Sequence, residues 1–206
     1  GDFYVIEKGG RVQRLRSDGS PVLDWMMPRI DHGRPTGIST SPDGKVWIPD
    51  THEHRVLIYD NQGQVLHEFG RYGTEAGEFI YPTDITFGPD DLIYISEYGG
   101  NDRVQKFTAE MQHVMTFGKA GTDTGEFQRA SGSLYHKGKL YVADAINNRI
   151  LVFDTQTGKH IDTLGENHLD LPYDLTIDDR EHFYIAEYGA GRVTEMDLSG
   201  KIVATF

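Results

Sequence analysis

The sequence predicts an all-β protein, a β-propeller of four-stranded antiparallel blades, and three observations lead to this prediction. First, a strand–turn–strand unit, with an acid ending its first strand and an Arg opening its second, occurs five times at intervals of 43 to 47 residues. Second, further short apolar segments lie between these units, bounded by Gly, Pro, Asn and Asp. Third, no segment shows a sustained helical period. Four short strands in a period of about 40–50 residues are typical of a propeller blade.

The repeated unit is clearest at residues 139–154, where we expect strands at 139–144 and 149–154 joined by a short turn. The acid and the Arg of the five copies are Glu7 and Arg11, Asp50 and Arg55, Glu97 and Arg103, Asp144 and Arg149, and Glu187 and Arg192. We interpret them as structural, each acid accepting N–H bonds in its own turn and pairing with the Arg. The alternative is a ring of five acids that holds a cation or a basic ligand. Repetition in every blade favours the structural interpretation, because a working site normally needs unlike residues.

The other strands of each period are predicted on either side of this unit. Opening strands follow turns at 35–38, 82–85, 131–134 and 172–175, and closing strands include 65–69 and 114–117. The chain starts after a first strand and stops at the end of a fourth strand. It therefore holds five sets of second to fourth strands but only four first strands. We expect one domain, residues 1–206, with repeats at about 1–33, 34–79, 80–127, 128–170 and 171–206.

The order of the short motifs resembles the NHL repeat. That order is Pro-x-Gly/Asp-Ile, Val/Tyr-x-x-Asp/Glu, Asn-x-Arg-Ile/Val-x-x-Phe-Asp and Phe-Gly-x-x-Gly-x-x-x-Gly-x-Phe, and the linkers 73–79 and 121–127 match each other closely. The resemblance covers essentially the whole chain and implies a propeller that is commonly six-bladed. We therefore expect most of a six-bladed ring, and a closed five-bladed ring is the alternative. The resemblance implies little about function, because related propellers host unrelated chemistries.

Composition narrows the classes of partner. The formal net charge of −12 argues against nucleic acid, whose non-specific binding depends on Lys and Arg neutralising phosphates. No apolar run of about 18 residues exists, so we expect a soluble chain without a membrane span. The absence of Cys excludes disulfides and thiolate metal sites, and it permits an oxidising compartment. The first residue is Gly1 rather than Met, which indicates a processed precursor or a fragment. Together these points favour a periplasmic or extracellular protein.

Residues that differ between blades are the candidates for function. The loops between blades and the turns after the second strands should share one face, which we call the loop-rich face. Exposed aromatic side chains on this face are the candidates for binding a partner, namely Tyr72, Tyr81, Tyr98 and Tyr188. Unlike polar side chains at the mouth of the central channel are the candidates for an enzyme, namely Asp84, Tyr173 and Asp174.

We expect no metal or cofactor. The similar amidating lyases place zinc-binding His at the starts of first strands, where this chain has Thr36-Gly37, Thr83-Asp84, Gly132-Ser133 and Tyr173-Asp174, so the zinc site is not expected here. Asp84 and Asp174 with backbone oxygens would suit a channel cation such as Ca²⁺, and capping of strand ends is the alternative role. His52-Glu53-His54 has two His that could chelate a metal, but the sequence identifies no third ligand.

The sequence favours a rigid propeller scaffold without catalysis that binds a protein or peptide partner through its loop-rich face, either alone or as a subunit of a larger complex. The alternative is a metal-assisted lyase or lactonase-type enzyme with a cation in the central channel. No catalytic residue is assigned. RNA binding, which some NHL propellers show, is disfavoured by the acidic charge.

Overall fold

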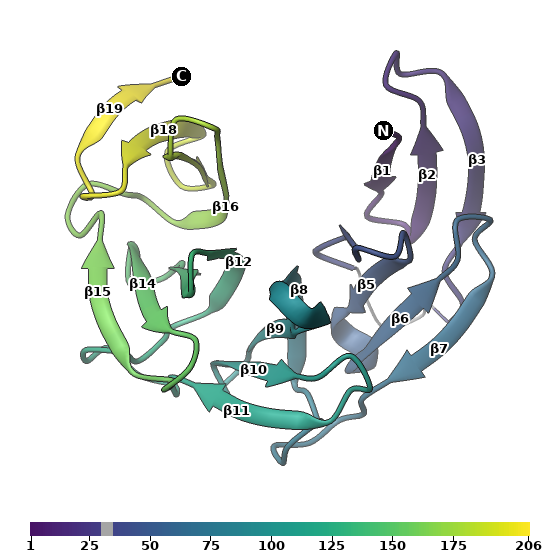
Figure 1. Cartoon of the computed structure of the whole chain (residues 1–206), viewed down its shortest axis with the longest axis horizontal. Coiled ribbons are helices and arrows are strands. Elements are labelled where there is room, and N and C mark those ends of the chain that lie inside the picture. Colours follow the sequence, from purple (N-terminus) through teal and green to yellow (C-terminus); the bar gives the residue numbers. More distant parts are fainter. Residues whose placement is uncertain (30–34) are drawn as a thin grey trace.

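The computed structural model describes residues 1–29 and 35–206, which form five antiparallel sheets side by side in an open arc (Figure 1). Within each sheet, neighbouring strands are consecutive in the sequence. The first sheet consists of β1 (Phe3–Ile6), β2 (Arg11–Leu15) and β3 (Pro21–Met26). The second consists of β4 (Ser39–Thr40), β5 (Val46–Asp50), β6 (Arg55–Tyr59) and β7 (Val65–Phe69).

The other three sheets repeat the four-stranded pattern. The third consists of β8 (Tyr81–Phe87), β9 (Ile93–Tyr98), β10 (Arg103–Phe107) and β11 (His113–Phe117). The fourth consists of β12 (Ala130–His136), β13 (Lys139–Asp144), β14 (Arg149–Asp154) and β15 (His160–Leu164). The fifth consists of β16 (Pro172–Ile177), β17 (His182–Glu187), β18 (Arg192–Asp197) and β19 (Ile202–Thr205).

This architecture confirms the predicted all-β propeller. The first blade has three strands and the other four blades have four each, as the strand count predicts. Across residues 1–29 and 35–206 the only helical segments are two 3-10 turns, η1 (Thr51–Glu53) and η2 (Pro89–Asp91). No helix in this part is long and apolar enough to cross a membrane. The five blades do not close on themselves, since the first and the last lie on either side of the open side of the arc (Figure 1).

The hydrophobic core lies between neighbouring blades. Strand β13 shows how it is built, because successive residues of a strand point to opposite faces of its sheet. Leu140 and Val142 pack against the third blade, whereas Tyr141 and Ala143 pack against the fifth. The middle strands are therefore apolar on both faces, and they hold the positions of the turns at their ends.

The innermost strand of the second blade is much shorter than its counterparts. β4 pairs only with Val46 and Trp47 of β5, whereas β8, β12 and β16 contain six or seven residues. Pro49 lies in β5 where this ladder would continue, and it has no N–H to donate. The missing donor explains why β4 is short while β5 still runs to Asp50.

Candidate functional site

The repeated acids and Arg lie next to each other in every blade. Arg149 Nε donates to Asp144 Oδ2 at 2.8 Å, and the pairs of the second, third and fifth blades have nitrogen–oxygen distances of 2.9, 2.5 and 2.9 Å. In these four blades the acid is at most 2% exposed. The pair of the first blade, Glu7 with Arg11, is 3.3 Å apart and exposed.

These pairs also hold the linkers that join consecutive blades. Arg149 Nη2 donates to three carbonyl oxygens of the linker 122–126, at 2.9 to 3.2 Å. The backbone N–H of Gln128, at the end of this linker, donates to Asp144 Oδ1 at 2.7 Å. Arg103 and Glu97 make the corresponding contacts in the third blade. In the third and fourth blades the linker from the preceding blade is therefore fixed to the turn after the second strand, and both lie on the loop-rich face.

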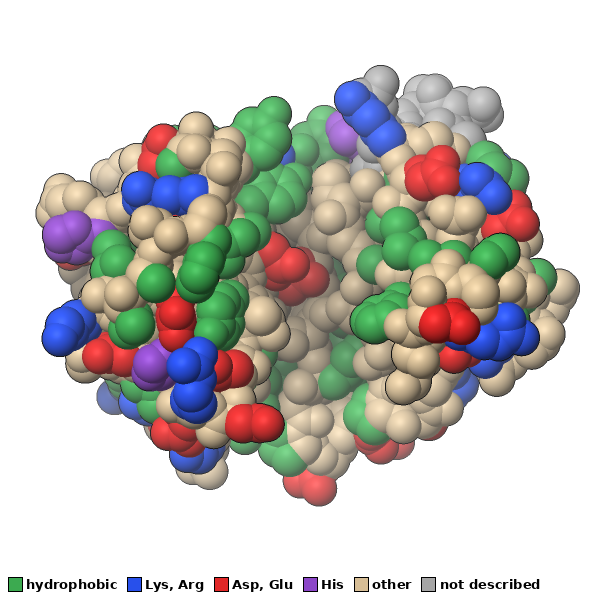
Figure 2. Space-filling model, turned by 90° about the horizontal axis from the view of Figure 1, so that it is seen from above, with side chains coloured by type: hydrophobic (Ala, Val, Ile, Leu, Met, Phe, Trp, Pro, Cys, Tyr) green, Lys and Arg blue, Asp and Glu red, His purple; other side chains and the backbone are tan. Residues whose placement is uncertain are grey.

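The central channel contains a cavity of about 190 Å³ between the innermost strands. It is lined by Ile6 of the first blade and by Thr36, Gly37, Ile38, Thr83, Asp84, Ser131, Gly132, Tyr173 and Asp174. Figure 2 looks into the open side of the arc and shows a central hollow with acidic side chains in its wall. The predicted channel residues Asp84, Tyr173 and Asp174 thus come together in one cavity.

Around this channel, the same position of successive innermost segments is occupied in turn by Gly37, Asp84, Gly132 and Asp174. Asp84 and Asp174 lie opposite Ser96 and Ala186 in their sheets. In the fourth blade Gly132, not Ser133, lies at the corresponding position, within a β-bulge between Ala130 and Ser133, so the pair aligned as Gly132-Ser133 in the sequence is Ser131-Gly132. The third and fifth blades contain the same bulge, so it does not distinguish the fourth blade. Counting from the matching linkers 73–79 and 121–127 aligns Gly132 with Asp84, as the structure does.

The glycine in the fourth blade allows the fifth blade to approach. A Cβ on Gly132 would lie 2.4 Å from Asp174 Oδ1 and 2.6 Å from its Cα. Any side chain at this position would therefore displace the backbone of the next innermost strand. Gly37 is equally close to the third blade, since a Cβ there would lie 2.6 Å from the carbonyl oxygen of Thr83.

Both carboxyl groups of the channel are harder to ionise than usual. Burial raises the pKa of Asp84 to about 7, the carboxylate of Asp174 adds to the effect, and hydrogen bonds from Ser133 oppose it. Ser133 donates its N–H and its hydroxyl to Asp84 Oδ2, at 2.8 and 2.9 Å. Burial also raises the pKa of Asp174, although this side chain is open to the channel and the N–H of Leu175 donates to it. At neutral pH the pair can therefore hold a proton or a cation.

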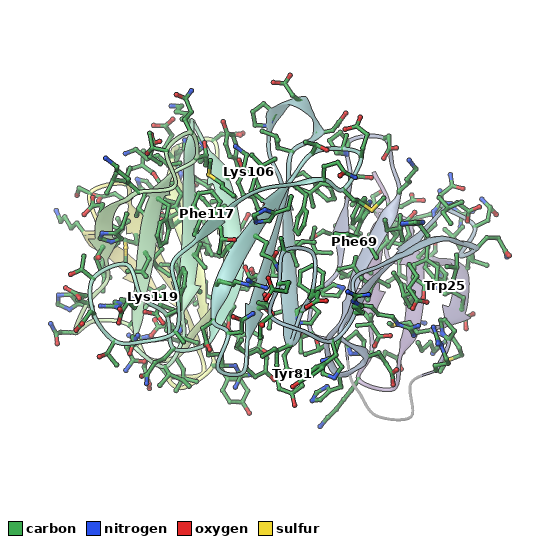
Figure 3. All side chains as sticks on the ribbon, turned by 90° about the horizontal axis from the view of Figure 1, so that it is seen from below. Trp25, Phe69, Tyr81, Lys106, Phe117 and Lys119 are labelled. Atoms are coloured by element: carbon green, nitrogen blue, oxygen red, sulfur yellow. The ribbon has the colours of Figure 1, made fainter. Side chains whose placement is uncertain are left out.

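A row of aromatic rings crosses the loop-rich face beside this channel. The rings of Tyr81 and Tyr98 lie 5.1 Å apart, and those of Tyr173 and Tyr188 lie 6.2 Å apart. The guanidinium of Arg129 joins the two pairs, with its carbon 4.9 Å from the ring centre of Tyr98 and 5.4 Å from that of Tyr173. Tyr81 lies at the lower edge of the molecule in Figure 3.

Tyr72 extends this row through a histidine. The ring of His54 lies 4.9 Å from Tyr72 and 5.5 Å from Tyr81. Nδ1 of His54 hydrogen-bonds to the carbonyl oxygen of Ile80. His52 also lies beside Tyr81, at 5.3 Å between ring centres. In the part of the chain that the structure describes, no three His, Asp or Glu side chains are grouped closely enough to hold a metal.

Sequence reasoning missed Arg129. The signal was present in the linkers, because Arg129 follows 121–127 at the place where Tyr81 follows 73–79. A single Arg after a Gly-rich linker indicates no function by itself. Its position becomes informative only in the folded chain, where it lies between tyrosines of two other blades.

Comparison with known proteins supports the NHL assignment. The chain is 33% identical over 177 residues to the human NHL repeat-containing protein 3, a match that covers 77% of this chain and 50% of that protein. No family model matches the chain. It spans half or less of the length of the curated relatives that it matches first.

Solved structures support the fold alone. The virginiamycin B lyase of Staphylococcus aureus superposes with a TM-score of 0.74 at 20% identity, covering 100% of this chain and 66% of the lyase chain. A chain of a nidogen–laminin complex superposes with a TM-score of 0.77 at 18% identity, covering 98% and 74%. The repeated motifs, the blade topology and the sequence relatives together show that this chain belongs to the NHL-repeat β-propellers.

Proposed function

We propose that this propeller is a rigid scaffold that binds a protein or peptide partner through its loop-rich face. The main support is the row of Tyr81, Tyr98, Arg129, Tyr173 and Tyr188, which brings side chains of three blades together on one surface. Tyrosine and arginine are enriched at the energetic centres of protein interfaces. Tyr188 is 78% exposed and Tyr72 is 67% exposed, so both rings are available to a partner.

The loops that present these rings are well fixed, which supports a scaffold. The linkers that enter the third, fourth and fifth blades are each held by the Arg of that blade, and their last residues are held by its acid. A surface that is already ordered loses little conformational entropy on binding, and this favours affinity. One of the similar structures is a nidogen–laminin complex, in which a propeller chain takes part in a protein assembly.

Selection of random dodecapeptides displayed on phage would test this proposal. We expect the immobilised chain to enrich specific peptides, and the double variant Tyr98→Ala, Tyr188→Ala to bind them at least about tenfold more weakly. Leu66→Ala is a matched control, because Leu66 is 50% exposed but lies on the outer strand β7. Equal binding by the double variant and the wild type would refute the assignment of this surface.

A metal-assisted lyase or lactonase-type activity is the second candidate, and the carboxylates in the channel cavity favour it. Asp84 and Asp174 would hold the cation, and oxygen ligands of this kind suit Ca²⁺. The cation would supply Lewis-acid chemistry, and Tyr173 lines the same cavity. Calorimetric titration with Ca²⁺ tests this candidate: we expect one bound ion in the wild type and none in Asp84→Ala. A wild type that binds no divalent cation would refute it.

A further inference from the structure

Arg129 is held in place by both its backbone and its side chain. Its N–H donates to Asp102 Oδ1, while Asp102 Oδ2 accepts the N–H of Gly100 at 2.9 Å. This anchoring holds the backbone of Arg129 in the left-handed region, at φ 68°. The rings of Tyr98 and Tyr173 contact the guanidinium, and Nη2 donates to the hydroxyl of Tyr173 at 3.4 Å. The charged group is therefore presented at a defined place.

The positive charge of Arg129 is not neutralised by a carboxylate, unlike the charges of other Arg residues on this face. Arg71, Arg103 and Arg149 on this face each pair with a carboxylate at 3.0 Å or less. Among the ion pairs formed within residues 1–29 and 35–206, none includes Arg129. Its Nε is enclosed by the protein, so a ligand from outside would meet the Nη atoms at the end of the guanidinium. A charge held between two rings without a carboxylate partner is suited to an anionic acceptor that arrives from outside.

A depression beside Arg129 gives the site a second feature. It has a volume of about 380 Å³, and its lining includes Tyr98, Phe127, Arg129 and Ile146. Ile146 is 53% exposed although it is aliphatic. A ligand that places an anionic group on Arg129 could therefore place an apolar side chain in this depression.

We propose that Arg129 binds the carboxylate of an acidic residue in a peptide segment of the partner, with an adjacent apolar residue of that segment in the depression next to Ile146. This inference rests on the proposed peptide-binding function and names the chemistry of its ligand. A carboxylate fits better than a phosphate, because a single guanidinium in a chain of formal charge −12 matches one negative charge and not two.

The peptides selected on the wild type provide the test. We expect them to share an Asp or Glu next to an aliphatic or aromatic residue. Replacing that acid with Asn or Gln should weaken binding by about 10- to 100-fold, measured by fluorescence anisotropy with synthetic peptides. Arg129→Gln should bind the acidic and amide forms equally weakly, whereas Arg129→Lys should keep part of the preference. Arg71→Gln removes the same charge from the same face and should behave as the wild type does.

The outcomes separate the two proposals. Enriched peptides without a shared acid, or an unchanged preference for the acid in Arg129→Gln, would overturn the role of Arg129 and leave peptide binding intact. Failure to enrich any peptide on the wild type would overturn both. The comparison of acidic and amide peptides on the wild type does not depend on the folding of any variant.

Discussion

Replacing Asp84 with Asn should stabilise the protein above about pH 6. Burial and the nearby carboxylate of Asp174 raise the pKa of Asp84 from 3.8 to about 7. Between these values the folded chain keeps a proton that the unfolded chain has released. The free energy of unfolding therefore falls as the pH rises through this window, and the loss is complete above the folded pKa.

The size of the effect follows from the two pKa values. A change from 3.8 to about 7 corresponds to roughly 4 kcal/mol for a fully desolvated carboxyl group. Asp84 is only partly buried, and water in the channel screens its charge, so we expect about 2 kcal/mol. Asn has the same shape without the charge, and its carbonyl oxygen can accept the hydrogen bonds that Ser133 donates. For a chain of this length, about 2 kcal/mol raises Tm by about 4–8 °C.

Urea denaturation at pH 4, 6 and 8, with chelator present, measures this difference. The wild type and Asp84→Asn should have similar free energies of unfolding at pH 4 and should diverge by pH 8. Asp43→Asn is the control, since Asp43 lies on an exposed turn and hydrogen bonds from Lys45 and Ser41 lower its pKa. A difference between the wild type and Asp84→Asn that is the same at every pH would refute the reasoning, as would an Asn variant that is less stable at pH 8.

Two further substitutions test the packing of the blades. Gly132→Ala should lower the free energy of unfolding by about 1–3 kcal/mol, because the added Cβ would collide with Asp174. Gly9→Ala is the control and should change it little, because a Cβ there would meet nothing within 4 Å. Equal effects of the two substitutions in thermal denaturation would contradict the close approach of the two blades. Arg149→Ala leaves Asp144 buried without its Arg partner and should lower the free energy of unfolding by about 3–5 kcal/mol, measured by urea denaturation. Arg11→Ala removes two exposed pairs, with Glu7 and Asp24, and should lower it by about 1 kcal/mol or less. A similar loss in both Arg variants would argue against a dependence on burial.

The repeats made the fold predictable, because the same pattern of strands and turns occurs in the sequence of each blade. Alternating apolar residues, turn residues and the acid–Arg unit agree with one another in every period, and such agreement specifies one structure. The propeller, the NHL assignment and the three-stranded first blade are confirmed by the structure and the comparisons. The alignment of the innermost strand in the fourth blade was wrong by one residue, because this strand lacks the Pro and Asp that mark the same strand in the third and fifth blades.

The sequence by itself determined the blades, because hydrogen bonding between adjacent strands and alternation of side chains act over a few residues. It also identified Asp84, Tyr173 and Asp174 as unlike residues at the channel mouth. Only the tertiary structure decided that Arg129 lies between Tyr98 and Tyr173, the latter 44 residues away in the chain. The physical reason is that contacts between blades depend on the angle at which whole sheets pack, and no local pattern encodes that angle.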